Sequence, residues 1–322
     1  MSPSPKRTDV AVDGRTLSVS NLDKVLFPRD GITKGDLIDY YRGVAPFLLP
    51  HLHNYPLTLQ RYPDGIDAQS FFEKHLPRGL PDWVDRVPLT SPGGTREKTT
   101  YMVCNDEAAL VYVANLATII LHVWTSHVPT IEEPDYVFFD LDPGETCTLK
   151  TLASVAIAMR DLLSEIKLNA LVKTSGGMGL HVVVPLASGY DYDAAKIFAE
   201  AVATQLAQRH PELVTLERSL KKRDQSLVYL DYLQVGRGKT IVSIYSVRAR
   251  DGAPVSTPLD WSEVEAFARK RSGMPEATFG QFNMRTTPKR LDRDGDVWLG
   301  SAWKKQRLEP AIAKAQKAWA PQ

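Results

Sequence analysis

Hydrophobic and polar positions divide the chain into segments with two different periods. Apolar residues recur every three to four positions in four long segments, which predicts amphipathic helices at 34–49, 105–120, 149–166 and 191–209. Runs rich in β-branched and aromatic residues lie between them and predict strands and hairpins within 9–20, 56–73, 88–104, 136–139, 171–185, 227–234 and 240–247. Because strand pairs alternate with helices, the pattern predicts a mixed α/β (α+β) fold with antiparallel hairpins.

Local signals mark where some of these elements begin and end. Thr33 precedes the first helix and Asp36 lies at the capping-box position, so the helix is expected to start at Lys34. Pro50 is expected to end that helix, and Asn105 is expected to cap the second one.

The predicted elements indicate one main domain with two flanking segments. Residues 1–8 are rich in Ser, Pro and basic side chains, and we expect them to be disordered. We expect a single domain over residues 9–300, with an N-terminal part (9–130) and a second part (131–300). A basic C-terminal helix is expected within residues 301–322.

Composition narrows the class of protein without naming a function. Of the 322 residues, 43% are apolar and 24% are charged, which is typical of a soluble globular protein. Lys and Arg (39) nearly balance Asp and Glu (38), so a nucleic-acid surface would need local segregation of charge. Cys104 and Cys147 fit no metal-binding spacing. There is neither a signal-peptide pattern nor a run long enough to span a bilayer, so we expect a cytoplasmic protein without a membrane partner.

Two carboxylates stand at the end of the most apolar strand. The run Tyr136–Phe139 leads into Asp140 and Asp142, and Pro143 then ends the strand. Side chains alternate along a strand, so both acids project to one side, about 7 Å apart. Two explanations are open with roughly even odds: a cation site, or a solvated acidic turn.

Two further segments carry candidate chemistry. Ser175 begins a glycine-rich turn that ends at His181, and its successive N–H groups can form an anion-binding nest. On its own, this segment is better explained, by roughly two to one, as an ordinary glycine hairpin with a packed histidine. Asp231 lies within an apolar strand, where an unpaired carboxylate is costly, although a half-buried strand showing it to water is the alternative. Together, three acids and a nest indicate a site that binds Mg²⁺ or Mn²⁺ and a nucleoside triphosphate.

These segments, in this order, resemble one known family. The motifs are Asp-Leu-Asp-Pro-Gly-Glu (140–145), Thr-Ser-Gly-Gly-Met-Gly-Leu-His (174–181), Asp-Tyr-Leu-Gln (231–234), Arg-Gly-Lys-Thr (237–240) and Tyr-Ser-Val-Arg-Ala-Arg (245–250). They resemble the polymerase domain of bacterial ligase D, a member of the archaeo-eukaryotic primase superfamily that serves in non-homologous end joining. The resemblance extends over about residues 15–300. It implies a primase-polymerase fold with an RRM-like, largely antiparallel catalytic sheet flanked by helices.

The resemblance also implies roles for individual residues. Asp140, Asp142 and Asp231 match the three catalytic, metal-binding aspartates. The nucleotide-binding positions are Ser175, Gly176, Gly177, His181, His122, Gln234, Arg248 and Phe71. The DNA-binding positions are Asn21, Lys24 and Lys34, which match a pocket for a 5′-phosphate, together with Arg61 and Phe72. Without the resemblance, solvated lysines, core phenylalanines and a core histidine would be the simpler explanations.

The activity implied is template-directed nucleotidyl transfer that fills short gaps and extends ends at DNA double-strand breaks. It implies two divalent metal ions (Mn²⁺ or Mg²⁺), NTP or dNTP substrates with ribonucleotides favoured, and DNA with a 5′-phosphorylated break or gap. Ku and a DNA ligase, in the same or a separate chain, are the expected partners of a monomer at the nucleoid. Two alternatives stay open: a module that binds or bridges DNA ends, and a de novo primase.

The chain departs from the family pattern at several positions. Met178 and Gln60 stand where relatives often carry lysine. Four basic residues precede Asp231 with a spacing shifted by about one residue, which leaves open whether Arg218, Lys221, Lys222 or Arg223 faces the nucleotide. The Lys-x-Asp-Gly signature of a nucleotidyl-transferring ligase is absent from the sequence.

Overall fold

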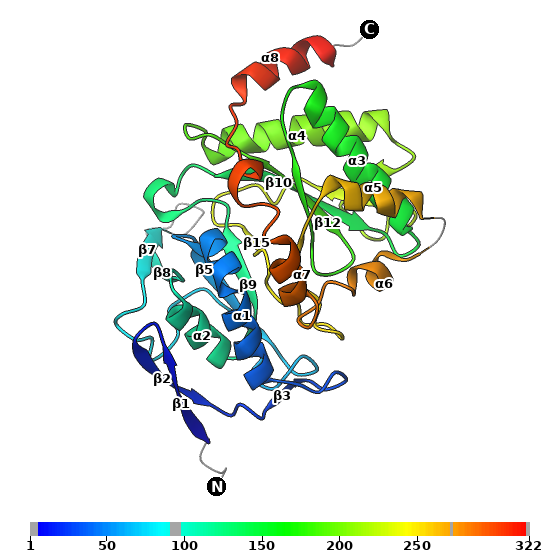
Figure 1. Ribbon diagram of the computed structural model, residues 1–322. Helices are drawn as coiled ribbons and strands as arrows, with labels where there is room; N and C mark the ends of the chain where they lie inside the picture. Colours follow the sequence, from blue (N-terminus) through cyan, green and yellow to red (C-terminus); the bar gives the residue numbers. More distant parts are fainter. Residues whose placement is uncertain (1–5, 91–97, 271–272, 320–322) are drawn as a thin grey trace. The chain divides into compact units, whose positions relative to one another are not determined.

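The computed structural model describes residues 6–90, 98–270 and 273–319, which form two compact units (Figure 1). The first unit consists of Met1–Pro129, Thr240–Ser256 and Phe282–Gly295. The second consists of Thr130–Lys239, Thr257–Gln281 and Asp296–Gln322. Each unit contains one six-stranded sheet, so the chain builds two separate cores.

The first unit combines an antiparallel sheet with three helices. Its sheet strands are β5 (Pro56–Arg61), β6 (Phe71–Glu73), β7 (Arg86–Thr90), β8 (Lys98–Val103), β9 (Thr118–Trp124) and β15 (Thr240–Val242). They follow the order β15-β9-β5-β8-β7, and β6 pairs with β5. The helices are α1 (Lys34–Leu52), α2 (Glu107–Asn115) and α7 (Thr287–Asp294). A hairpin of β1 (Arg7–Val12) and β2 (Arg15–Ser20) and a short pair of β3 (Val25–Phe27) and β4 (Ile32–Thr33) complete it, with a 3₁₀ turn at Val128–Thr130.

The second unit also combines a six-stranded sheet with helices. Its strands are β10 (Tyr136–Pro143), β11 (Leu171–Thr174), β12 (Leu180–Pro185), β13 (Val214–Thr215), β14 (Val228–Asp231) and β16 (Pro258–Leu259). They follow the order β13-β14-β10-β12-β11-β16, and every pair is antiparallel except β13 with β14. The helices are α3 (Leu149–Glu165), α4 (Tyr192–Arg209), α5 (Trp261–Arg269), α6 (Pro275–Phe279) and α8 (Glu309–Ala318), with a 3₁₀ turn at Gly300–Ala302. The predicted mixed, largely antiparallel α/β architecture is confirmed.

Strand β10 lies in the middle of the second sheet because its apolar run can be buried on both faces. Leu141 pairs with Leu180 of β12 and with Leu230 of β14, and none of the three is exposed. Helices α3 and α4 contact each other and β10. Because residues on the opposite face of β10 include the partly exposed Asp140, the helices cover the leucine face.

Two helix ends differ from the predictions. Helix α1 does not stop at Pro50 but continues to Leu52, although Thr33 and Asp36 form the expected capping box. Proline removes one backbone N–H, yet Leu48 and Leu52 are fully buried on either side of it, and that burial offsets the lost hydrogen bond.

The second helix was predicted to end five residues too late, at 120 instead of Asn115, and its cap was misplaced by one. Asp106, not Asn105, accepts from the Ala109 N–H at 2.7 Å, and α2 ends at Asn115. Ala117 then has a positive φ of 57°, and residues from Thr118 onward form β9. Apolar spacing alone did not distinguish the helix from the buried strand, and pairing with β5 decides it.

The structure also differs from the predictions near both ends of the chain. Arg7 and Thr8, expected to be disordered, pair with Ser20 and Val19 in the first hairpin; residues 1–5 lie outside the described residues. Residues 91–97 of the hairpin predicted within 88–104 also lie outside them. The C-terminal helix begins only at Glu309, because the backbone of Gln306 instead hydrogen-bonds to Pro185 and Ala187 beside β12.

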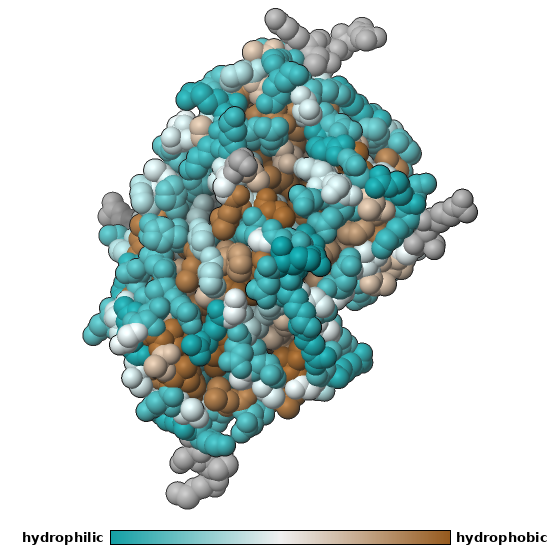
Figure 2. Space-filling model, in the orientation of Figure 1, coloured by the Kyte–Doolittle hydropathy of each residue, from teal (hydrophilic) through white to brown (hydrophobic). Residues whose placement is uncertain are grey.

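The surface shows mainly polar side chains with separate apolar patches. On the face drawn in Figure 2, hydrophilic residues cover most of the surface and hydrophobic ones show between them. The large apolar side chains that are exposed are Val25, Phe71, Phe72, Ile197, Leu220, Met274, Leu299 and Ile312. In the described part of the chain, no helix has both the length and the apolar character that crossing a membrane requires.

Candidate active site

Strand pairing brings the predicted acids of the second unit onto one face of its sheet. Asp140 on β10 lies directly opposite Asp231 on β14 and opposite His181 on β12. Directly opposed residues of antiparallel strands point to the same side, and Asp142, two positions further along, points there too. We call this set of four side chains, Asp140, Asp142, Asp231 and His181, the carboxylate face.

Polar contacts orient three members of the carboxylate face. His181 is buried, and its Nε2 lies 3.3 Å from Oδ1 of Asp140, whose side chain is 24% exposed. Asp231 accepts from the Leu233 N–H at 2.9 Å through Oδ1 and from Gln234 Nε2 at 2.9 Å through Oδ2. The structure therefore places Gln234 against a carboxylate, with its amide orienting Asp231.

The donors of the carboxylate face have the chemistry of a hard-cation site. Carboxylate oxygens are the ligands that Mg²⁺ and Mn²⁺ prefer, and three of them share this face. Within residues 6–90, 98–270 and 273–319, no three His, Cys, Asp or Glu side chains converge into a ready-made metal cage. The residue types and their common face fit a divalent cation.

The glycine-rich turn after β11 is closed around the hydroxyl of Ser175. Ser175 Oγ accepts from the N–H groups of Gly177 and Gly179, both at 3.2 Å, and Gly176 has a φ of 73°. A Cβ on Gly179 would lie 2.6 Å from the Leu141 carbonyl oxygen, so the turn approaches β10 as only glycine allows. The N–H groups of Gly177 and Gly179 therefore point into the turn, which lies beside the carboxylate face.

Four further predicted residues lie together on the sheet of the first unit. Phe71 and Phe72 on β6 are 43% and 59% exposed, so the alternative that they are core residues is wrong. The Phe72 ring lies 5.5 Å from that of His122 on β9. The Arg61 guanidinium lies 5.1 Å from the centre of the Phe71 ring. Exposed aromatic rings flanked by a cation and an imidazole suit stacking on bases.

The two positions nearest these rings are fixed by local contacts. Gln60 Oε1 lies 3.4 Å from His122 Nε2, so the residue that replaces a common lysine contacts the predicted nucleotide-binding histidine. Arg61 also donates to Glu73 at 2.8 Å and to the Leu116 carbonyl at 3.0 Å.

Arg248, also in this unit, is half-buried, and its backbone N–H donates to the Pro254 carbonyl.

The predicted 5′-phosphate residues meet at the start of α1. The Lys34 N–H donates to the Lys24 carbonyl at 2.8 Å, and the Lys24 N–H donates to the carbonyl of Asn21, which has a φ of 54°. Lys24 Nζ forms an ion pair of 2.6 Å with Asp64. We call Lys24 and Lys34 the lysine pair.

Lys34 is not the solvated lysine that its sequence context allowed. Its side chain is 4% exposed, and its Nζ donates to Oδ1 and to the backbone carbonyl of Asn115 at 2.9 and 3.0 Å. Burial, and then the positive charge of Lys24, lower the pKa of Lys34 to about 8. The lysine pair therefore concentrates positive charge where one member has lost most of its hydration.

One residue next to the carboxylate face was left undecided by the sequence. The Arg223 guanidinium lies 3.7 Å from the centre of the Tyr229 ring, two positions before Asp231 on β14. Among the four basic residues before Asp231, this contact distinguishes Arg223. The aromatic residue two positions before the acid was the available signal, because i and i+2 share a face of a strand.

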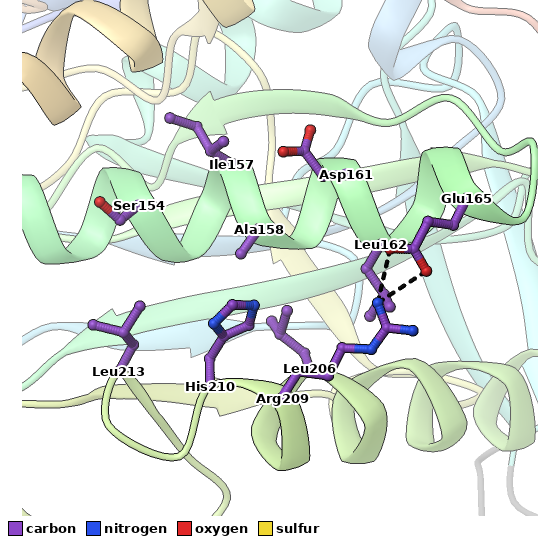
Figure 3. Close-up of a pocket in the computed structure, with 10 residues that line it drawn as sticks. All are labelled: Ser154, Ile157, Ala158, Asp161, Leu162, Glu165, Leu206, Arg209, His210 and Leu213. Carbon is purple, nitrogen blue, oxygen red and sulfur yellow. Dashed lines mark hydrogen bonds and ion pairs between the residues drawn. The ribbon is translucent and has the colours of Figure 1, made fainter. Parts of the chain in front are cut away.

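A groove elsewhere in the second unit is separate from these residues. It lies between α3 and α4, has a volume of about 350 Å³ and is closed at one end by the Arg209–Glu165 pair (Figure 3). The described residues that line it include none of the predicted site residues. It lies in the helix layer that covers the leucine face of β10, so it is distinct from the carboxylate face.

Comparisons with known proteins agree with the resemblance that the motifs carry. Residues 33–298 match the family model described as LigD, primase-polymerase domain. A multifunctional non-homologous end joining protein LigD of Mycolicibacterium smegmatis is 37% identical over 76% of this chain and 32% of that protein. The LigD protein of Pseudomonas aeruginosa is 32% identical over 92% of this chain and 34% of that protein. The chain thus spans about a third of the length of these relatives.

A solved structure extends the agreement to the fold. The polymerase domain of Mycobacterium tuberculosis ligase D, in complex with DNA, superposes with a TM-score of 0.78 and 34% identity, over 88% of this chain and 96% of that one. This match confirms the primase-polymerase fold that the motifs implied. The chain belongs to the LigD primase-polymerase domain family, whose members are nucleotidyltransferases of end joining.

Proposed function

We propose that this protein is a template-directed nucleotidyltransferase that fills short gaps and extends ends at DNA double-strand breaks during non-homologous end joining. The observation that carries the proposal is the register of Asp140 with Asp231 and His181, which puts three acids and a histidine on one face. Family membership supports the reaction class, and the solved relative with bound DNA supports a nucleic-acid substrate.

In this proposal Asp140, Asp142 and Asp231 hold two divalent cations, Mn²⁺ or Mg²⁺. When bound, such cations supply Lewis acidity that makes a primer 3′-hydroxyl easier to deprotonate and neutralises the charge of the triphosphate and pyrophosphate. Gln234 keeps the Asp231 carboxylate oriented through its 2.9 Å hydrogen bond. His181, buried against Asp140, can donate a hydrogen bond to a phosphate oxygen at the same face.

The turn from Ser175 to Gly179 receives the triphosphate. Its Gly177 and Gly179 N–H groups now point at Ser175 Oγ, and an anion placed there would accept from the same donors. The exposed Phe71 ring stacks on the incoming base and Phe72 on the template side, contacts worth about 1–3 kcal/mol per base. Arg248 and His122 bind the nucleotide phosphates.

The lysine pair and Asn21 bind the 5′-phosphate on the downstream side of the gap. A terminal phosphate dianion is matched by two ammonium groups and loop N–H donors. Because Lys24 now pairs with Asp64, phosphate binding exchanges one carboxylate partner for a stronger anionic one. We further propose that ribonucleotides are favoured, and that Ku and a DNA ligase act with this polymerase.

One assay tests the reaction. A gapped duplex with a 5′-phosphate is offered with each rNTP or dNTP, in Mg²⁺ or Mn²⁺, and primer extension is measured. We expect extension that stops after a few nucleotides, with faster ribonucleotide addition. Tight binding of the gapped duplex with no extension under any condition would support an end-bridging module instead. Synthesis on a template without a primer, at the same rate as primer extension, would indicate a primase.

A further inference from the structure

The loop that precedes Asp231 is tied down despite its composition. Residues 216–227 connect β13 to β14 and carry four basic side chains, and Leu220 among them is 70% exposed. Such a sequence suggests a flexible basic loop. Yet the N–H groups of Lys222 and Arg223 both donate to the Ser219 carbonyl at 3.0 Å, so the loop contains a hydrogen-bonded turn.

Arg223 is held at three points of its guanidinium. The group lies 3.7 Å from the centre of the Tyr229 ring, its Nε donates to the Glu217 carbonyl at 3.1 Å, and its Nη2 donates to the Arg218 carbonyl at 3.3 Å. The two carbonyls take two of the five guanidinium N–H groups, so the other N–H groups can donate to an oxyanion.

Tyr229 lies on the same face of the sheet as the four residues of the carboxylate face. It lies directly opposite Asp142 on β10, two positions before Asp231, and is 7% exposed. Burial and the charge of Asp231 raise the pKa of Tyr229, and the nearby Arg223 and Arg218 act in the opposite direction. These directions agree with a ring placed between the acids and the basic loop.

Gln225 joins the same loop to the turn that follows Asp142. Its Oε1 accepts from the Glu145 N–H at 3.3 Å, and its carbonyl oxygen accepts from the Thr146 N–H at 3.1 Å. Its Nε2 donates to the carbonyls of Leu220 (3.4 Å) and Arg223 (3.1 Å). The Gln225 side chain therefore links the loop before Asp231 to the turn after Asp142.

The fit at this junction is close. A Cβ on Gly144 would lie 2.2 Å from the Gln225 carbonyl oxygen, which no side chain could occupy without moving backbone. The loop is consequently seated against the turn after Asp142 by backbone contact as well as by the Gln225 amide.

We propose that Gln225 and Tyr229 are positioning residues: they hold Arg223 in a fixed place at the carboxylate face, where its guanidinium meets the phosphates of the incoming nucleotide. The meeting with phosphate rests on the proposed polymerase function, whereas the anchoring of the loop does not. Preorganised cations bind anions without the cost of ordering a long side chain at each encounter.

Limited trypsin digestion tests the anchoring without any substrate. Cleavage after Lys221, Lys222 and Arg223 is followed by mass spectrometry in the parent protein, Gln225→Ala and Gln225→Glu, with Gln208→Ala, an exposed glutamine on α4, as the matched control. We expect cleavage about tenfold faster in Gln225→Ala and in Gln225→Glu, which loses the two Nε2 donors, and no change in Gln208→Ala. Equal rates in all four proteins would overturn the anchoring.

Steady-state kinetics test what the anchoring does. We expect Tyr229→Leu to raise KM for the nucleotide about tenfold with kcat changed less than about threefold, and Tyr229→Phe, which keeps the ring, to restore the parent KM. Thermal unfolding shows whether each variant is folded. A loss of kcat at unchanged KM in Tyr229→Leu, or a failure of Tyr229→Phe to restore KM, would contradict the positioning role. If the parent protein extends no primer, the polymerase proposal fails, while the digestion still decides the anchoring.

Discussion

The carboxylate face and the lysine pair obtain their geometry in opposite ways. Asp140 and Asp231 are placed by strand register, because directly opposed residues of neighbouring strands are kept at one spacing by the backbone. Lys24 and Lys34 are placed by side-chain partners, Asp64 for one and Asn115 for the other. A site fixed by backbone keeps its shape when a side chain is changed. A site fixed by side-chain partners binds its ligand in competition with those partners.

The largest expected effect tests the backbone-fixed site. Asp140→Asn or Asp231→Asn should reduce primer extension by about four to six orders of magnitude, the range seen when one member of a catalytic group that acts as a unit is removed. Binding of the gapped duplex should change little, because the strand register is unaffected. Rates and Kd are compared with those of Asp82→Asn, a fully exposed acid of the first unit. Extension by Asp231→Asn at the parent rate would contradict the assignment.

The next effect concerns the turn that carries the carboxylate face. Gly144→Ala should lower the free energy of unfolding by about 1–3 kcal/mol, since its methyl group would overlap the Gln225 carbonyl and force the backbone to shift.

Gly43→Ala is the matched control for this change. Gly43 is exposed within α1 and has no atom within 4 Å of a built Cβ, so alanine should stabilise the protein by about 0.5–1 kcal/mol. Denaturant unfolding measures both variants, and a Gly144→Ala protein as stable as the parent would show that the turn is not fixed by this contact.

A smaller effect tests competition at the lysine pair. Lys24→Ala should reduce the preference for a 5′-phosphate over a 5′-hydroxyl end about tenfold, because it removes one charged partner of the phosphate. Asp64→Asn should increase the same preference two- to threefold (about 0.4–0.6 kcal/mol), because the competing carboxylate is gone. The ratio of the two Kd values measures each, with Lys289→Ala as the control. If Asp64→Asn weakened the preference instead, the competition would be disproved.

The smallest effect is a dependence on pH. Because the pKa of Lys34 is about 8, it loses its proton in the folded protein above pH 8, and the preference for a 5′-phosphate should fall severalfold between pH 7 and pH 9.

The free energy of unfolding should rise, not fall, in this pH range. Between pH 8 and about 10.5 the unfolded chain still binds the Lys34 proton while the folded protein does not, so this lysine makes the free energy of unfolding rise with pH. Lys34→Met should abolish both dependences. A flat pH profile of the 5′-phosphate preference in the parent protein would contradict the lowered pKa.

Sequence reasoning predicted the type of most elements and misplaced several boundaries. It distinguished strands from helices wherever glycines, prolines or caps interrupted the pattern, as at Thr33. It failed at residues 118–120, where an apolar run fits a helix and a buried strand equally well. It also ended α1 at Pro50, because the burial of Leu52 is a tertiary contact that no local signal reports.

For the site, the sequence by itself determined the chemical inventory: the acids, the glycine turn and the order of motifs that mark the family. Only the tertiary structure decided which strand lies beside which, and hence that Asp140 is opposite both Asp231 and His181. It also decided that Lys34 is buried and that Arg223, among four basic neighbours, stacks on Tyr229. The physical reason is that strand register, burial and ring contacts depend on residues distant in the chain, whereas residue type and local spacing do not.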